Sequence, residues 1–173
     1  IDDMLFLARA DNAQAVLHRE RFDLREEIEK VAAFFELLCD ERQVSIKVEG
    51  EATAFADRTL LRRAIANLTS NALRHTPSGG RVGVTARANP DGSVEVAVSN
   101  DGAPIPSEHI ERIFDRFYRV DASREESRLG AGLGLSIVKS IIGLHGGRIT
   151  VRSRPGERTM FSLYLPPPTA DMT

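Results

Sequence analysis

The sequence predicts an α+β fold, a two-layer sandwich in which helices pack on one face of a mixed β-sheet. Segments with apolar residues at helical spacing are interleaved along the chain with segments in which apolar and polar residues alternate. The strand-like segments are joined in pairs by short turns, which favours an α+β sandwich over a parallel, doubly wound sheet. The length of 173 residues fits one domain with a buried core, with or without a short appendage.

Residues 1–14 predict a short helix, because apolar residues recur at helical spacing from Met4 to Ala8. So short an amphipathic helix needs a partner on which to pack. It is either the end of a helix from a preceding domain or an N-terminal helix of this one. Because the chain starts at Ile1 rather than Met, we expect it to be part of a longer protein. The main domain is expected to span residues 15–168, and residues 169–173 to fray.

The first third of the main domain predicts strand, helix and strand. A short strand is expected at Glu20 to Phe22, and Asp23 then supplies the N-cap of a helix. The apolar stripe of this helix covers residues 24–41. Alternation predicts a strand at Val44 to Val48, and Ala54 to Ala56 is expected to be its short hairpin partner.

A long helix and a hairpin are predicted next. The helix has an N-cap at Asp57 and runs to about His75. Arg81 to Ala88 and Ser93 to Ser99 alternate, and the Asn-Pro-Asp-Gly turn at residues 89–92 joins them. The last third predicts, in order, a loop at 101–106, a short helix at 108–114, a mobile loop at 120–129, a helix at 134–144, and strands at 148–153 and 160–165.

Composition excludes several classes of partner and site. The 23 basic and 25 acidic residues leave a net charge of −2, which is too balanced for binding nucleic acid through bulk electrostatics. The single cysteine excludes an intramolecular disulfide framework and a zinc cluster of several thiolates. No apolar run approaches the length that crosses a bilayer, and the start lacks the pattern of a secretory signal.

The helix expected over residues 57–75 carries two stripes. The apolar stripe predicts the face that packs on the core and consists of Leu61, Ile65, Leu68 and Ala72. The second stripe is polar and consists of Asn67, Asn71, Arg74 and His75. Two asparagines one turn apart disfavour a helix, but their carbonyl oxygens suit Mg²⁺, and an arginine suits a phosphate. A solvated polar face would give the same pattern.

Two glycine-containing loops carry further candidates. Asn100 and Gly102 follow a predicted strand, where a polar side chain can read the edge of a base; an ordinary turn would look the same. Residues 130–135, Gly-Ala-Gly-Leu-Gly-Leu, lead into a helix, where backbone N–H groups can meet phosphate oxygens; a flexible hinge is the alternative. Together with the polar stripe, these features match the metal, base and phosphates of a bound nucleotide.

With these features in this order, the chain resembles the ATP-binding catalytic domain of a bacterial two-component sensor histidine kinase, in the ATPase superfamily shared with gyrase and Hsp90. Residues 67–76, Asn-Leu-Thr-Ser-Asn-Ala-Leu-Arg-His-Thr, resemble the N box of that family. Residues 114–119, Phe-Asp-Arg-Phe-Tyr-Arg, resemble its F box, and residues 100–105 and 130–135 lie where its first two glycine boxes belong. The run Asp2 to Ala8 is most similar to the heavy-metal sensor subgroup.

The resemblance implies a Bergerat-type ATP-binding fold and a role for each matching residue. Asn67 and Arg119 would be the catalytic residues, Asn67 near the phosphates or the metal and Arg119 near the γ-phosphate. Asn71 would ligate Mg²⁺, and the F-box phenylalanines would anchor a lid, residues 120–129, over ATP. The other implied ATP-binding residues are Arg74, His75, Asn100, Gly102, Ile105, Phe114, Phe117, Tyr118, Gly130, Gly132, Leu133, Gly134, Leu135 and Thr159.

The sequence departs from the family pattern at three positions and in one absence. Where the family often has a second glycine in its first glycine box, this chain has Pro104, which makes the local backbone stiffer. The adenine-reading position, usually Asp, is Asn100, whose carbonyl oxygen can still accept a hydrogen bond from the adenine amino group. The last glycine-threonine box reads Arg158-Thr159, so that only Thr159 matches. The acceptor histidine of the family lies in a His-Glu/Asp segment of the dimerisation domain, and no such segment contains His18, His75, His109 or His145.

The implied function is that of a protein-histidine kinase catalytic domain, which binds Mg-ATP and donates its γ-phosphoryl group to a histidine on the dimerisation domain. Residues 1–14 would be the end of the second helix of that domain. A response regulator would be the downstream partner; the parent would be a homodimeric inner-membrane protein and this fragment its monomeric cytoplasmic part. Two other functions stay open: a non-enzymatic, ATP-dependent regulatory switch and a serine kinase of the anti-sigma type.

Overall fold

The computed structural model describes residues 2–11, 15–120 and 132–169. These residues form a five-stranded sheet in the order β2-β4-β5-β7-β6. Within it, β2 and β4 are parallel and all other neighbours are antiparallel. The strands of this sheet are β2 (Ser45–Glu51), β4 (Arg81–Ala88), β5 (Val94–Asn100), β6 (Arg148–Arg152) and β7 (Thr159–Leu165).

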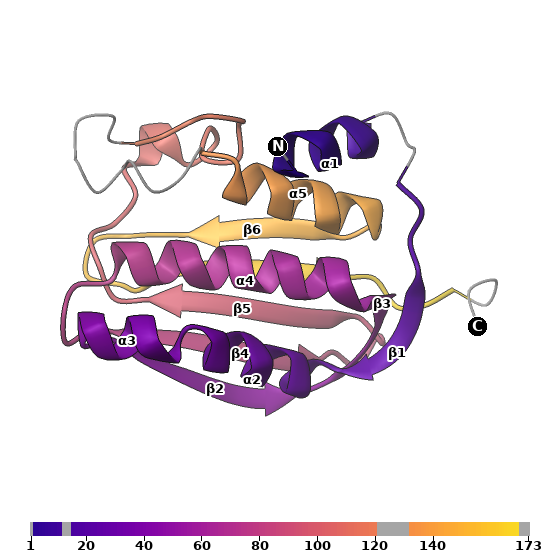
Figure 1. Cartoon of the computed structure of the whole chain (residues 1–173), viewed down its shortest axis with the longest axis horizontal. Coiled ribbons are helices and arrows are strands. Elements are labelled where there is room, and N and C mark those ends of the chain that lie inside the picture. The colour runs from indigo at the N-terminus through magenta and orange to yellow at the C-terminus, as the bar shows by residue number, and fades with distance from the viewer. Residues whose placement is uncertain (1, 12–14, 121–131, 170–173) are drawn as a thin grey trace.

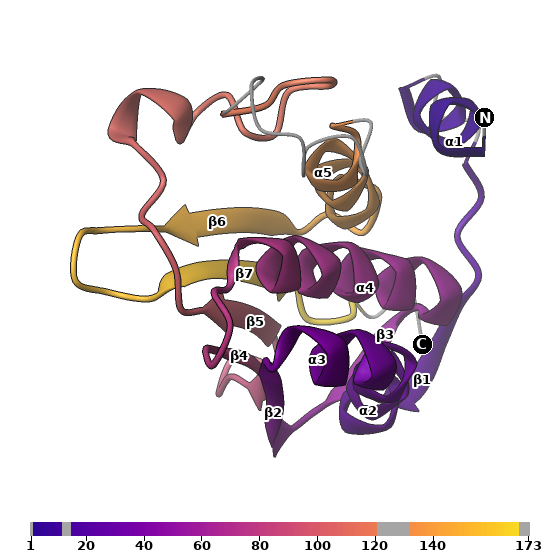
Figure 2. The same cartoon turned by 60° about the vertical axis from the view of Figure 1, so that its left-hand side comes forward.

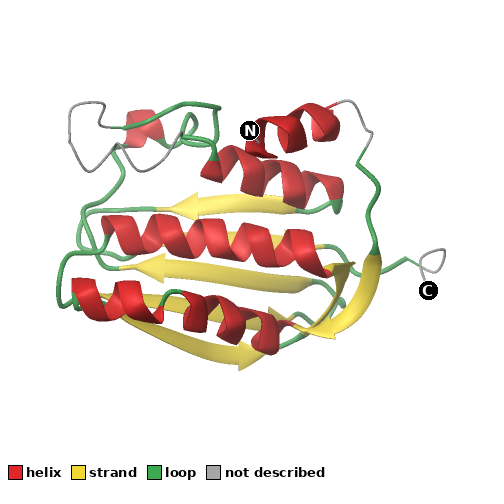
Figure 3. Ribbon diagram, viewed as in Figure 1, coloured by secondary structure: helices red, strands yellow, loops and turns green. Residues whose placement is uncertain are grey.

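Helices cover one face of this sheet, and α1 lies beside α5 (Figure 1; Figure 2). Figure 3 shows the helical layer in front of the strands, with the helices running roughly along them. This arrangement confirms the predicted α+β sandwich. In place of the helix predicted at residues 108–114 there is only a 3-10 turn, η1 (Ser107–His109). The α-helices are α1 (Asp2–Asp11), α2 (Leu24–Phe34), α3 (Glu36–Arg42), α4 (Arg58–His75) and α5 (Gly134–Leu144).

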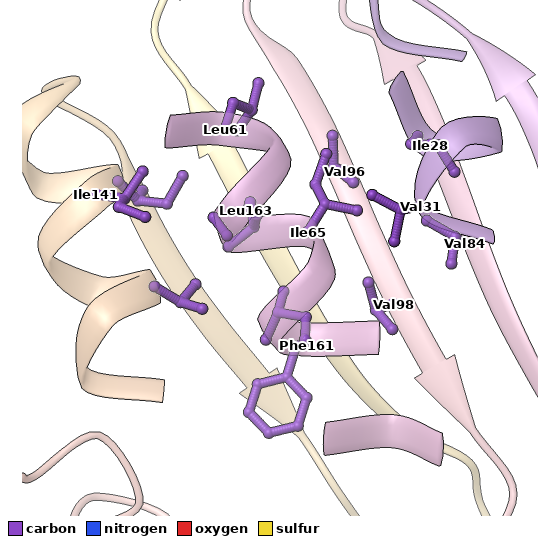
Figure 4. Packing of buried hydrophobic residues seen from close by; sticks show 14 of the residues in the cluster. Ile28, Val31, Leu61, Ile65, Val84, Val96, Val98, Ile141, Phe161 and Leu163 are labelled. Atoms are coloured by element: carbon purple, nitrogen blue, oxygen red, sulfur yellow. The ribbon is translucent and has the colours of Figure 1, made fainter. Parts of the chain in front are cut away.

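The hydrophobic core lies between α4 and the sheet. The predicted apolar stripe of α4 is at most 2% exposed, and it consists of Leu61, Ile65, Leu68 and Ala72. This stripe belongs to the same buried cluster as Val96, Val98 and Phe161 of the central strands (Figure 4). Each such side chain contributes about 1.5–3 kcal/mol through its burial. Because that face of α4 is fixed inward, its polar stripe is held at the border of the helical layer.

Several predicted boundaries are confirmed. α4 begins after Asp57, whose Oδ1 accepts a hydrogen bond from the Leu60 amide at 3.0 Å, and it ends at His75. The hairpin of β4 and β5 pairs as expected, and α5 has the bounds that the sequence predicts. The C-terminal ends of α4, β5 and β6 lie at the same end of the molecule, on the left in Figure 1.

The predicted hairpin partner of residues 44–48 is wrong. The strand β3 (Thr53–Asp57) pairs with β1 (Arg19–Asp23) in a separate two-stranded sheet, while β2 pairs in parallel with β4. Ala52, between β2 and β3, explains the change of partner. Its side chain is buried, and its carbonyl oxygen accepts a hydrogen bond from the Leu24 amide at 2.9 Å. The chain is therefore held under the start of α2 and crosses from one sheet to the other.

The predicted single helix over residues 24–41 is interrupted at Phe35, which separates α2 from α3. Phe35 has φ −94° and ψ 3°, and its amide is shared between the carbonyl oxygens of Val31 (3.3 Å) and Ala32 (3.1 Å). The interruption lets Phe35 pack against the core, whereas Phe34 remains 80% exposed.

Candidate functional site

Segments that are far apart in the sequence meet where β5 ends. Asn67 of α4 donates a hydrogen bond to the carbonyl oxygen of the first residue of α5 at 3.5 Å. The loop after β5 touches the other end of α4, since a Cβ added to Gly102 would collide with the His75 carbonyl oxygen. The segment after η1 contacts the residues just before α5, because the Phe117 amide donates a hydrogen bond to the Gly132 carbonyl oxygen at 2.9 Å. The structure thus brings together all three features singled out in the sequence.

The polar stripe of α4 faces this meeting point. Asn67 and Asn71 are half-buried, whereas Arg74 and His75, in the last turn of α4, are exposed. Residues at positions i, i+4 and i+7 of a helix lie on one face, so the Asn67 contact with α5 places the whole stripe on the α5 side. Two amide groups and a guanidinium group are therefore presented along one line.

Asn100 is the last residue of β5 and is only 4% exposed. Its Nδ2 donates a hydrogen bond to the Asp101 carbonyl oxygen at 2.9 Å, which fixes the orientation of the amide and keeps Oδ1 as an acceptor. Gly102 follows with φ +153°, in a conformation that favours glycine. A buried acceptor beside a close backbone approach suits the exocyclic amino group of a base.

A row of polar side chains continues from Asn100 across the end of the sheet. Thr159 of β7 is paired with Asn100 and is 5% exposed. Its Oγ1 lies 2.7 Å from Oγ of Ser153, and Ser153 Oγ accepts a hydrogen bond from the Ile105 amide at 2.8 Å. Sequence reasoning found Asn100, Ile105 and Thr159 but missed Ser153, because its place opposite Thr159 follows only from the β6–β7 register.

Phe117 and Gly132 hold together the two chain segments that flank residues 121–131. Beyond their backbone hydrogen bond, both residues have positive φ, +62° for Phe117 and +70° for Gly132. A Cβ on Gly132 would lie 3.0 Å from the Phe117 Cα and carbonyl carbon. Glycine at 132 is therefore required both by its own conformation and by the close approach of Phe117.

The other two aromatic residues of the F box pack away from the polar stripe. The Phe114 ring meets the buried Phe161 ring edge to face, with centroids 6.2 Å apart. The Tyr118 hydroxyl is hydrogen-bonded to Nδ1 of His109, and the Arg112 guanidinium lies 4.4 Å from the centre of the Tyr118 ring. These contacts anchor the segment to the core and to η1, while 58% of Phe117 is exposed.

The start of α5 offers backbone donors. Leu133, at the N-cap, is buried and supplies no side-chain cap, and Gly134 leaves open space where a Cβ would be. Uncapped N–H groups at a helix N-terminus attract anions. Leu135, the second residue of α5, is half-buried beside them. The predicted ligand Gly130 and the predicted lid, apart from Val120, lie outside the described residues.

Arg74 and Arg119 place two positive charges at the site. Although Arg74 is exposed overall, partial burial of its guanidinium group lowers its pKa below the ordinary value, and the positive charge of Arg119 lowers this pKa further. Arginine stays protonated at neutral pH, so the two guanidinium groups repel each other. Guanidinium groups suit phosphate oxygens, with which they form charge-assisted, often paired hydrogen bonds.

The donor set also fits a magnesium ion that is shared with phosphates. Within residues 2–11, 15–120 and 132–169, there is no group of three or more His, Cys, Asp or Glu side chains that could hold a metal. Mg²⁺ typically takes one or two protein oxygens and completes its shell with phosphate oxygens and water. The Asn67 and Asn71 amide oxygens on the polar stripe suit that role.

Comparisons with known proteins show the family of the chain. The family model described as histidine kinase-, DNA gyrase B-, and HSP90-like ATPase matches residues 56–169. The chain is 46% identical over 167 residues to the sensor histidine kinase CusS of Escherichia coli strain K12, covering 96% of this chain and 34% of CusS. It is 42% identical to the sensor protein CzcS of Cupriavidus metallidurans, covering 96% of this chain and 35% of CzcS.

A solved structure of the same architecture contains a bound nucleotide analogue. Full-length ShkA in complex with AMPPNP superposes with a TM-score of 0.86 and 29% identity, over 98% of this chain and 35% of ShkA. The chain spans about a third of the length of the curated relatives it matches. Of the helices in the described ranges, none is long and apolar enough to cross a membrane.

Proposed function

The chain belongs to the histidine kinase-, DNA gyrase B-, and HSP90-like ATPase family, and on that basis we propose that it is the catalytic domain of a sensor histidine kinase. It binds ATP with Mg²⁺ and donates the γ-phosphoryl group to a histidine on the dimerisation domain of the parent protein. The parent acts in two-component signalling and responds to a heavy-metal ion, as its similarity to CusS and CzcS suggests.

The observation that carries this proposal is the contact between Asn67 of α4 and Gly134 of α5. Asn67 Nδ2 donates a hydrogen bond to the Gly134 carbonyl oxygen at 3.5 Å, so the amide and guanidinium groups of the polar stripe lie on the side of α4 that faces the start of α5. Amide oxygens that suit Mg²⁺ and backbone donors that suit phosphate are thereby gathered at one place.

The side chains around this contact bind and orient the triphosphate. Arg119 approaches the γ-phosphate, Arg74 and His75 flank the chain of phosphates, and backbone N–H groups at the start of α5 bind their oxygens. When bound, Mg²⁺ neutralises charge on the phosphate oxygens, and the Asn71 amide oxygen holds it, with Asn67 beside it. Phosphoryl transfer depends on positioning and charge neutralisation, so no general base within this chain is required.

Adenine lies at the end of the sheet. Asn100 Oδ1 accepts a hydrogen bond from the amino group of the base, while Gly102 and Ile105 form the backbone wall beside it. Thr159 adds a hydroxyl group opposite Asn100. An asparagine makes this contact without a charge, so adenine is recognised by a neutral hydrogen bond.

The phosphoacceptor lies on another domain. In the transfer, the bond between the γ-phosphorus and the bridging oxygen breaks, and a bond from phosphorus to an imidazole nitrogen forms. Two histidines of this chain already use their ring nitrogens in hydrogen bonds. Both ring nitrogens of His145 are hydrogen-bonded to backbone groups, and Nδ1 of His109 is hydrogen-bonded to the Tyr118 hydroxyl group. His18 and His75 are not followed by an acidic residue, as the acceptor of this family is.

The domain assignment belongs to the same proposal. Residues 1–14 are the end of the second helix of the dimerisation domain, and residues 15–168 are the catalytic domain. The parent is a homodimer of the inner membrane with this part in the cytoplasm, and it passes its phosphoryl group to a response regulator. The present fragment is a monomer.

Phosphotransfer in a reconstituted mixture tests the function. The chain is incubated with ATP labelled at the γ-phosphate, alone and with a dimerisation domain of the sensor-kinase type. We expect acid-labile phosphohistidine on the dimerisation domain and no efficient labelling of the chain alone. Binding of ATP without any phosphohistidine would favour a regulatory switch, and an acid-stable phosphoserine would favour a serine kinase.

A further inference from the structure

Ser153 extends the pairing of β6 and β7 by one residue. The last recorded pair of these strands is Arg152 with Met160, so the next position in the same register sets Ser153 opposite Thr159. Thr159 is in turn paired with Asn100 on β5. Asn100, Thr159 and Ser153 therefore form one row across the ends of three neighbouring strands, at the end of the sheet where the base is proposed to bind.

Ser153 is the point where this row meets the loop after β5. Its Oγ accepts a hydrogen bond from the Ile105 amide at 2.8 Å, across 48 residues of sequence. The same Oγ lies 2.7 Å from Thr159 Oγ1. One hydroxyl group thus ties the loop that carries Gly102 and Ile105 to the buried threonine of β7.

The hydroxyl groups of Ser153 and Thr159 have hydrogen-bonding capacity that their contact does not use. Each hydroxyl group has one donor and two acceptor positions. The contact between Ser153 and Thr159 uses one of their two protons, and the Ile105 amide fills one acceptor position of Ser153. The other proton is not used by this contact, and Asn100, which is paired with Thr159, lies on the same face of the sheet. The edge of adenine carries an amino donor beside a ring-nitrogen acceptor. It therefore complements a protein site that presents an acceptor, here Asn100, beside a hydroxyl donor.

We propose that Ser153 is a positioning residue for base recognition: it orients the Thr159 hydroxyl group and holds the loop of residues 101–106 against the base. This inference rests on the proposed function, because it assigns a further residue to the adenine end of the same site. Ser153 does not touch the phosphate end, which α4, Arg119 and α5 provide. Its removal should therefore weaken binding of the base and leave binding of the phosphates unchanged.

The test compares ATP with inorganic tripolyphosphate, each with Mg²⁺, by isothermal titration of the chain. For Ser153→Ala we expect a Kd for ATP that is about 3- to 10-fold weaker, the size of one lost neutral hydrogen bond, with the Kd for tripolyphosphate within about 2-fold of wild type. Ser153→Thr retains the hydroxyl group and should bind ATP like wild type. Ser153→Val has the shape of that threonine variant without its hydroxyl group and should bind like Ser153→Ala.

A matched control is Ser99→Ala, which removes a hydroxyl group from β5 at the position before Asn100, on the opposite face of the sheet. It should leave both affinities unchanged. Equal weakening for ATP and tripolyphosphate, or no weakening for ATP, would overturn the assignment of Ser153. If Ser153→Ala does not fold, the Thr and Val variants decide the question alone. Failure of the wild-type chain to bind ATP would instead overturn the proposed function.

Discussion

His145 joins the end of α5 to the start of α4 through both nitrogens of its ring. Nδ1 lies 2.7 Å from the Ile141 carbonyl oxygen, to which it donates, and Nε2 accepts a hydrogen bond from the Asp57 amide at 3.0 Å. This set of partners requires the neutral ring, because a protonated Nε2 could not accept. Burial has the largest effect and lowers the pKa of His145. The hydrogen bond to the Ile141 carbonyl group raises this pKa by less, and the charges of Arg19 and Asp57, which lower and raise it in turn, have smaller effects still.

The lowered pKa predicts a loss of stability in mild acid. The folded state favours the neutral ring, so the stabilisation is complete above the unfolded pKa of about 6.5 and is lost as the pH falls from there toward the folded pKa. The expected loss approaches about 1 kcal/mol per pH unit within that window. It can be measured as the unfolding free energy between pH 7.5 and 5.5.

Two variants test whether His145, rather than another histidine, causes the loss of stability in acid. His145→Gln should be less stable at pH 7.5 but should lose less stability toward pH 5.5 than wild type. His18→Gln removes a histidine for which only the backbone amide is engaged, with Asp57 Oδ2, so its pH dependence should match wild type. An unchanged pH dependence in His145→Gln would show that this ring does not carry the effect.

At the scale of elements, substitution of two glycines near α5 should change the unfolding free energy in opposite directions. Gly132→Ala places a Cβ in a positive-φ conformation against Phe117, and should lower stability by about 1–2 kcal/mol. Gly143→Ala, inside α5 with no atom within 4 Å of the new Cβ, should raise it by about 0.5–1 kcal/mol. Chemical denaturation measures both; equal effects in the two variants would contradict the contact between Phe117 and the start of α5.

The sequence predicted those elements whose pattern is local. The N-cap and both stripes of α4, the turn of the β4–β5 hairpin and the glycines flanking α5 are properties of contiguous residues. The partner of β3 could not be predicted this way, because it depends on Ala52 being held under α2, 28 residues away in sequence. Ser153 was missed for the same reason: its role appears only when strands β5, β7 and β6 are placed side by side.

At the scale of the whole molecule, α1 is docked on the domain through few contacts. Leu7 has no exposed surface, and the Arg63 guanidinium pairs with Asp3 at 2.5 Å. At the other end, Arg116 of the F box pairs with Asp11 at 2.6 Å. The ion pairs are partly exposed and contribute little, about 0–1 kcal/mol each, so Leu7 dominates the docking.

Leu7→Ala should therefore lower the unfolding free energy by about 2–4 kcal/mol if α1 is docked in solution. Leu5→Ala on the same helix, where 52% of the side chain is exposed, should change it by less than about 0.5 kcal/mol. Thermal or urea unfolding of the two variants gives the comparison. Equal stabilities would contradict the docked position of α1.

In the proposed function, the polar stripe of α4 binds Mg²⁺ and the phosphates of ATP. Its decisive test is titration of ATP into wild type and Asn71→Ala, with and without Mg²⁺, with Ser70→Ala, the neighbouring residue on α4, as the control. Alanine is a better helix former than asparagine, so a change in binding will not reflect loss of α4. The wild type and Ser70→Ala should bind ATP more tightly with Mg²⁺, and Asn71→Ala should lose that gain while binding ATP alone as before. A Mg²⁺-dependent gain that survives in Asn71→Ala would contradict the site.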